Sequence, residues 1–124
     1  MTKQRKVHNG YIPLSGVTYK FMKIGKTINL WLSIGLDIQK LLKIKARSRI
    51  LLEYDKKNPY KILISKTKIK ERDTYSILQH RAAKAVHISP KWKFKKPPAL
   101  AFKDPRKTKV RIRKKGISIE LIGC

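Results

Sequence analysis

Thr27-Ile-Asn-Leu-Trp-Leu-Ser-Ile34 opens the stretch of sequence that decides the fold. Its isoleucines and leucines recur at every second position, which is the spacing of a strand with one buried face. Gly35 ends this alternation, and the apolar residues of 35–44 then follow the spacing of one helical face, which predicts a short helix. Residues 49–66 predict a β-hairpin, because two alternating runs flank the turn signal Asp55-Lys-Lys-Asn-Pro59.

A family resemblance rests on Ile34-Gly-Leu-Asp-Ile-Gln-Lys-Leu-Leu-Lys-Ile44, which follows an apolar strand and precedes a basic connection and a hairpin. This order resembles the AbrB/MazE-type swapped-hairpin domain, found in DNA-binding transcription regulators and antitoxins that form intertwined dimers. The resemblance covers residues 27–66 and implies a swapped-hairpin barrel that binds DNA. Gly35 stands where the family usually has proline, and Lys45-Ala-Arg-Ser48 replaces its acidic turn. Trp31 falls where the family often has a DNA-contacting arginine, so that contact is not carried over.

The rest of the chain predicts one β-rich domain over residues 17–124, preceded by a mobile basic segment, residues 1–16. The domain divides into a first half (17–66), a linker (67–73) and a second half (74–124). Val17–Ile24 alternates as a strand and is joined to the next strand by a two-residue turn. In the second half the pattern predicts strands over 74–79 and 85–94, a proline-rich connection without a helix over 95–108, and a hairpin over 109–122.

Both halves share the order strand, connection, hairpin. We therefore predict a mainly β fold with one short helix. The expected architecture is an AbrB-like swapped-hairpin barrel, closed within one chain by a degenerate internal duplication in which the second helix is lost. The residue identities do not repeat between the halves, so a chance occurrence of this order in a mixed β domain stays open as the alternative.

The charge of the chain predicts a polyanionic partner. Its 124 residues include 32 lysines and arginines against 7 acidic residues, a formal net charge of +25. Such an excess repels itself and weakens a small fold unless a partner neutralises it. Nucleic acid fits best, while an acidic membrane surface or an acidic protein is the alternative. The abundance of Lys and Ile would also suit AT-rich coding DNA, as in a phage or mobile element, so part of the lysine excess could be compositional.

Several function classes are not supported by the sequence. The only cysteine is Cys124, which excludes an intrachain disulfide and predicts a reducing, cytoplasmic setting. The longest nearly apolar run, residues 28–36, is too short to span a bilayer, and no signal peptide is expected. Glu71 and Asp73 are expected to balance neighbouring cations rather than form a catalytic pair. No metal, cofactor or catalytic residue is predicted, because the histidines do not match zinc-ligand spacing: His8, His80 and His87.

Basic side chains on strands, on the short helix and around aromatic residues are the candidate nucleic-acid contacts. Arg111 and Arg113 alternate with apolar residues, so both are expected to project from one strand face. Arginine can pair bidentately with guanine, whereas lysine chiefly contacts phosphate. Each lysine taken alone could equally be a solvated surface residue. The candidates are Lys40, Lys43, Arg47, Arg49, Lys91, Lys93, Lys95, Lys96, Arg111 and Arg113.

Trp92 and Phe94 lie among these lysines and permit two interpretations. They could form a stacking platform for single-stranded nucleic acid, but their alternation with Lys91 and Lys93 favours burial in the core. Trp31 falls on the face opposite the buried isoleucines and leucines. The sequence leaves open whether it packs under a neighbouring layer or contacts a partner.

These features predict a cytoplasmic, non-enzymatic, double-stranded DNA-binding transcriptional regulator that acts as a monomer or homodimer. One alternative is a module for single-stranded nucleic acid or RNA. The other is an antitoxin or inhibitor that docks on an acidic protein partner.

Overall fold

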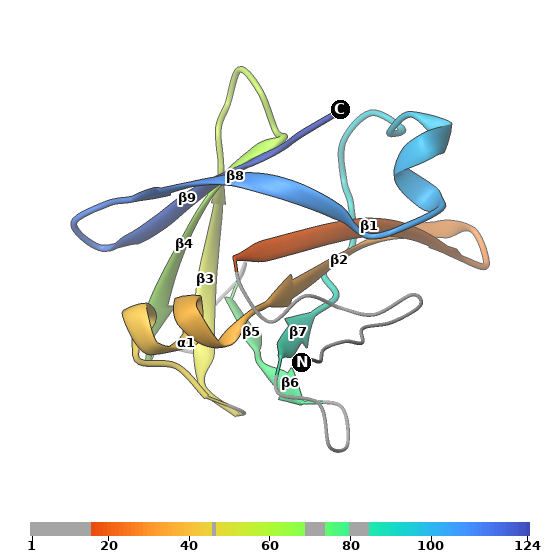
Figure 1. Ribbon diagram of the computed structural model, residues 1–124. Helices are drawn as coiled ribbons and strands as arrows, with labels where there is room; N and C mark the ends of the chain where they lie inside the picture. Colours follow the sequence, from red (N-terminus) through yellow and green to blue (C-terminus); the bar gives the residue numbers. More distant parts are fainter. Residues whose placement is uncertain (1–15, 46, 69–73, 80–84) are drawn as a thin grey trace, which may run out of the picture.

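The computed structural model describes residues 16–45, 47–68, 74–79 and 85–124, which carry nine strands, one α-helix and one 3-10 helix (Figure 1). The proposed N-terminal segment (1–16) and linker (67–73) lie almost wholly outside these residues. The elements are β1 (Val17–Ile24), β2 (Thr27–Ile34), α1 (Leu36–Leu42), β3 (Arg49–Tyr54), β4 (Lys61–Thr67), β5 (Thr74–Ser76), β6 (Leu78–Gln79), β7 (Val86–Ile88), η1 (Ala99–Phe102), β8 (Arg106–Ile112) and β9 (Gly116–Leu121).

The strands form one antiparallel sheet in the order β5-β3-β4-β9-β8-β1-β2-β7-β6. Its two edge strands, β5 and β6, are separated in the chain only by Ile77, which is buried. The Ile77 N–H donates to Ser48 O at 2.8 Å, and Ile77 O accepts from the Arg47 N–H at 2.9 Å. One continuous segment therefore pairs first with β3 and then with β7, and the sheet is nearly closed into a barrel. The predicted mainly β fold with one short α-helix is confirmed.

The two halves exchange their hairpins. The β3–β4 hairpin of the first half pairs with β5 and β9, both from the second half. The β8–β9 hairpin of the second half pairs with β1 and β4, both from the first half. Matching strands of the halves meet directly at two seams, β2 with β7 and β4 with β9. The exchange takes place within one chain, so a single chain forms the nearly closed barrel, as the duplicated element order predicted.

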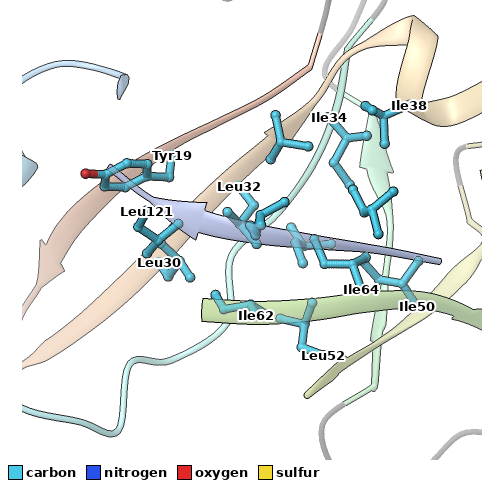
Figure 2. Close-up of a cluster of buried hydrophobic side chains, with 14 of the residues drawn as sticks. Tyr19, Leu30, Leu32, Ile34, Ile38, Ile50, Leu52, Ile62, Ile64 and Leu121 are labelled. Atoms are coloured by element: carbon cyan, nitrogen blue, oxygen red, sulfur yellow. The ribbon is translucent and has the colours of Figure 1, made fainter. Parts of the chain in front are cut away.

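Alternating apolar residues from both sets of strands fill the barrel (Figure 2). Tyr19, Leu30 and Leu32 from β1 and β2 face Ile62 and Ile64 of β4 across the interior, and all five are buried. The side chains of successive strand residues point to opposite faces of the sheet, so the residues that point inward determine which residues point outward. The polar and basic residues between them thereby point away from the interior, and of these Thr18 and Ser33 are themselves buried.

Helix α1 covers one end of the barrel and is held there by its ends. Gly35 precedes it in an extended conformation, and the Asp37 carboxylate accepts the Gly16 N–H at 2.8 and 3.0 Å. Ile38 of the helix joins the core. Lys43 ends the helix in the left-handed conformation (φ 56°), after which the Ile44 N–H bonds back to Gln39 O at 2.9 Å. Packing rather than intrinsic propensity stabilises so short a helix.

Three predictions about the second half were wrong in detail. The predicted strand 85–94 ends at Ile88, because Pro90 lacks an N–H; a bridge at Lys91 keeps the chain beside β2. The connection 95–108 contains the 3-10 helix η1, anchored by buried Ala101, at the place corresponding to α1. Strand β8 starts at Arg106 rather than 109, because its first residues pair with β1.

Candidate nucleic-acid interface

The C-terminal end of α1 and the turn between β8 and β9 lie on the same side of the barrel (Figure 1). A pocket of about 170 Å³ lies between them, and none of the described residues that line it is acidic. We call this region the basic end and define it by Lys40, Lys43, Lys66, Arg113, Lys114 and Lys115. The sequence predicted Lys40, Lys43 and Arg113 separately; the fold places the two lysines at the C-terminal end of α1 and Arg113 in the lining of the adjoining pocket.

Backbone geometry presents these cations to solvent. The Lys66 ammonium group donates to the carbonyl oxygen of Lys43 at 2.8 Å, which places a cation at the negative end of the helix dipole. In the turn, the Arg113 N–H donates to Gly116 O at 2.8 Å, so Lys114 and Lys115 form its tip. Both lysines are exposed. Their ammonium groups can therefore contact phosphate without unfolding the turn.

Two apolar side chains lie within the basic end. Ile112 is 71% exposed, and Leu41 is 45% exposed. Both line the pocket beside Lys66 and the turn. Exposed apolar residues surrounded by cations suit a partner that combines negative charge with apolar edges, as a DNA groove does through its phosphates and thymine methyl groups.

Arg111 and Arg113 project from the same outer face, as predicted, but this face also carries acidic residues. They line a pocket of about 420 Å³ over β3, β4, β9 and β8, together with Glu53, Asp55 and Glu120. Across the strands, Lys61, Glu120 and Lys109 lie side by side in register. The Arg113 Nε–H also donates to Ser118 Oγ at 3.2 Å. Carboxylates next to cations make this mixed-charge face a weaker site for polyphosphate than the basic end.

The other predicted arginines lie in and after the connection that follows α1. Arg47 is exposed and has a left-handed backbone (φ 75°), with its N–H bonded to Ile77 O. Arg49 is half-buried, and its Nη1 donates to Thr74 Oγ1 at 3.2 Å. Arg49 thus links β3 to β5, so we assign it chiefly to the closure of the barrel.

Trp92 is a core residue, which confirms the favoured interpretation of its alternation. It is 7% exposed, stacks on Tyr60 with a centroid distance of 5.4 Å, and packs edge-on against Phe21 at 4.9 Å. Its indole N–H donates to Lys95 O at 2.9 Å. Phe94 was expected inside but is 42% exposed. The side chains of four predicted contacts around Trp92 are exposed: Lys91, Lys93, Lys95 and Lys96.

Trp31 lies on the outer face of β2, and its ring stacks on that of His87 from β7. The ring centroids are 4.0 Å apart and the planes are inclined by 14°. The sequence left the role of Trp31 open, and the structure identifies His87 as the residue on which its ring packs. Both side chains are half-buried.

Among the described residues, no three His, Cys, Asp or Glu side chains gather where they could hold a metal ion. Burial raises the pKa of the Tyr19 hydroxyl, which donates to Ile122 O and lies 3.4 Å from Cys124 Sγ. Tyr19 thereby fixes the C-terminal residues against β1. Of the helices described, none has the length and apolar character needed to cross a membrane.

Asp55 shapes the β3–β4 turn, and its pKa makes a testable prediction. The backbone N–H groups of Lys57 and Asn58 donate to its carboxylate at 2.8 and 3.1 Å, which lowers the pKa of Asp55 below its usual value. Because its pKa is lower in the folded state, the ionised Asp55 carboxylate stabilises the fold at pH values above the usual carboxyl pKa. This stabilisation is lost as the pH falls through the pKa of Asp55 in the folded protein. We expect Asp55→Asn, which keeps an acceptor oxygen, to reduce the acid sensitivity of the thermal midpoint between about pH 5 and pH 2. An unchanged pH profile would contradict this assignment.

Lys66, Lys114 and Lys115 were missed as candidate contacts. The dipeptide Lys114-Lys115 predicts a turn, and a basic pair at a hairpin tip is also a visible signal for phosphate contact. Lys66 gave no local signal, because its position beside the β8–β9 turn depends on the hairpin exchange.

Comparison of the chain with protein-family models, with curated proteins and with solved structures found no match. Its function is therefore inferred from the chemistry of its own surface.

Proposed function

We propose that this protein is a non-enzymatic nucleic-acid-binding protein that binds duplex DNA through the basic end and acts in transcription regulation. The observation that carries the proposal is a pocket lined by four cations and no acidic residue among those described, beside the end of α1 that carries Lys40 and Lys43, in a chain of net charge +25. Phosphate contacts by lysine and arginine supply most non-specific affinity for DNA.

The shape of the basic end supports a duplex target. A two-stranded β-ribbon fits the major groove, and the turn after β8 presents such a ribbon with Lys114 and Lys115 at its tip. Helix α1 beside it can place Lys40 and Lys43 against the neighbouring phosphates. Arg113, at the start of the turn, is the arginine best placed to contact a base edge.

The relationship to AbrB/MazE-type regulators is part of the same proposal. The hairpin exchange within the chain supports it, because that family builds its barrel from exchanged hairpins. Here one chain supplies both halves, so we expect a monomer to bind DNA.

A binding titration tests the proposal. Labelled duplex DNA, single-stranded DNA and RNA are titrated at about 50 and 200 mM salt, and six phosphate contacts should lower duplex affinity about 1,000-fold between the two conditions. Binding that is independent of salt, or no binding to any nucleic acid at the lower salt, would overturn the proposal. In that case, co-purification of one acidic protein that survives nuclease and high salt would support the inhibitor alternative.

A further inference from the structure

The outer face of β1, β2 and β7 combines stacked aromatic rings with cations, at a place separate from the basic end. Leu30, Leu32 and Ile34 of β2 point into the core, so Trp31 points outward. Trp31 stacks on His87, which lies opposite Ser33 on the neighbouring strand. The stack therefore spans two strands on the surface of the barrel.

Three lysines lie around this stack, one on β1, one on β8 and one in the segment that follows β7. Lys20 of β1 lies directly opposite Trp31, and side chains at such paired positions share one face and lie about 5 Å apart at Cβ. Lys107 of β8 pairs with Thr18 on the same face, and Lys91 forms a bridge with Asn29. Both of these lysines are exposed.

Negative charge is missing from these strands. The sequences of β1, β2 and β7 contain no aspartate or glutamate, in contrast to the mixed-charge face over β3, β4, β9 and β8. The electrostatic field at Trp31 therefore comes mainly from lysines, which favours a ligand that carries phosphate.

Ser33 adds a polar group beside the rings. Its side chain is 3% exposed, and its Oγ has no hydrogen-bond partner within the described part of the chain. It lies in register between Thr18 and His87 on the outer face. A buried hydroxyl of this kind can donate to or accept from an incoming polar group.

We infer that Trp31 and His87 form a stacking site for an unpaired nucleobase of a single-stranded nucleic acid, with Lys20, Lys91 and Lys107 contacting the phosphates on either side. Bases stack on aromatic side chains irrespective of sequence, and cations that follow the backbone supply the remaining affinity. Paired bases stack within the duplex and expose only their edges in the grooves. This site therefore selects unpaired nucleotides over a duplex.

The inference rests on the proposed nucleic-acid binding but uses a different surface. A protein with both sites would hold duplex DNA at the basic end and an unpaired base of the same or another strand at Trp31. The two sites can be tested separately because they share no residue.

The two tryptophans allow a direct test by fluorescence. Trp92 is buried and serves as an internal reference, whereas Trp31 should be quenched when a base stacks on it. We expect oligo-dT to quench the wild-type protein and to leave the Trp31→Phe variant, which reports only Trp92, almost unchanged. Trp31→Ala should lose roughly five- to 100-fold in affinity for oligo-dT and keep its duplex affinity.

A charge variant keeps the test independent of the stability of Trp31→Ala. Lys20→Glu retains both rings and should weaken oligo-dT binding and lower its salt dependence. Duplex binding without any quenching by oligo-dT, or equal oligo-dT affinities for all three variants and the wild type, would overturn the stacking site and leave the proposed function standing. Failure to bind either nucleic acid would overturn the proposed function itself.

Discussion

Gly116→Ala is expected to destabilise the protein by at least about 2–3 kcal/mol, a large share of the stability of a small domain. A Cβ at this position would lie 2.0 Å from the carbonyl oxygen of Ile64 and 3.0 Å from Ser65 Cα. These are backbone atoms of β4, so neither can rotate away. The added methyl group must push apart β4 and β9, the seam at which the two exchanged hairpins pair.

Chemical denaturation of the variant and of a matched control measures this effect. Ser118→Ala introduces the same side chain two residues along β9, where Ser118 lies on the outer face, and should cost no more than about 1 kcal/mol, because it removes only the exposed hydrogen bond from Arg113. Equal stabilities for the two variants would show that β9 does not approach β4 as closely as the structure indicates.

Lys114→Glu combined with Lys115→Glu is expected to weaken duplex DNA binding about 100-fold at 50 mM salt, if each lysine contacts one phosphate. The slope of log affinity against log salt should also become less steep by about two, because two fewer counterions are released on binding. Both lysines are exposed at the turn, so the fold should be unaffected. Fluorescence anisotropy at several salt concentrations measures both quantities.

The turn of the other hairpin provides the matched control. Lys56 and Lys57 form an exposed pair in the β3–β4 turn, which occupies the corresponding place in the first half. Reversing both charges changes the net charge by the same amount as the variant at the basic end. We expect less than about a threefold loss of duplex affinity from this control. Equal losses in the two double variants would show that net charge alone drives binding and that the basic end is not the site.

The two hairpin turns occupy corresponding places but differ in chemistry. The β3–β4 turn depends on the Asp55 carboxylate, which accepts two backbone N–H groups, so a negative charge is built into it. The β8–β9 turn is closed by the Arg113 N–H and Gly116 O and needs no carboxylate. Only the second turn can therefore present cations without a neighbouring acid. This difference distinguishes the turn at the basic end from the corresponding turn of the first half.

Most strands could be predicted from local pattern, because alternation reports which face is buried. The bounds of β1 and β2 agree with the prediction, and α1 lies within the predicted 35–44. Prediction was poorest over 85–108, where proline interrupts the pattern. There the 3-10 helix and the start of β8 depend on contacts with distant parts of the core and with β1, which no local window contains.

The candidate site, too, could be predicted from the sequence only in part. Arg111 and Arg113 were correctly placed on one face from their spacing, but the sequence did not show that Glu53 and Glu120 share that face. Likewise, the stack of Trp31 on His87 joins residues 56 positions apart in the chain. Cross-strand neighbours are set by register, and register follows from the complete set of pairings.

The sequence by itself determined that this chain folds into a β-rich body with one short helix, because the apolar period of each segment fixes its local structure and its buried face. It also determined the excess of positive charge. Only the tertiary structure decided which cations lie together, which are accompanied by carboxylates and which aromatic rings are exposed. The physical reason is that two hairpins exchange partners across the chain, so residues far apart in sequence become neighbours on the surface of one barrel.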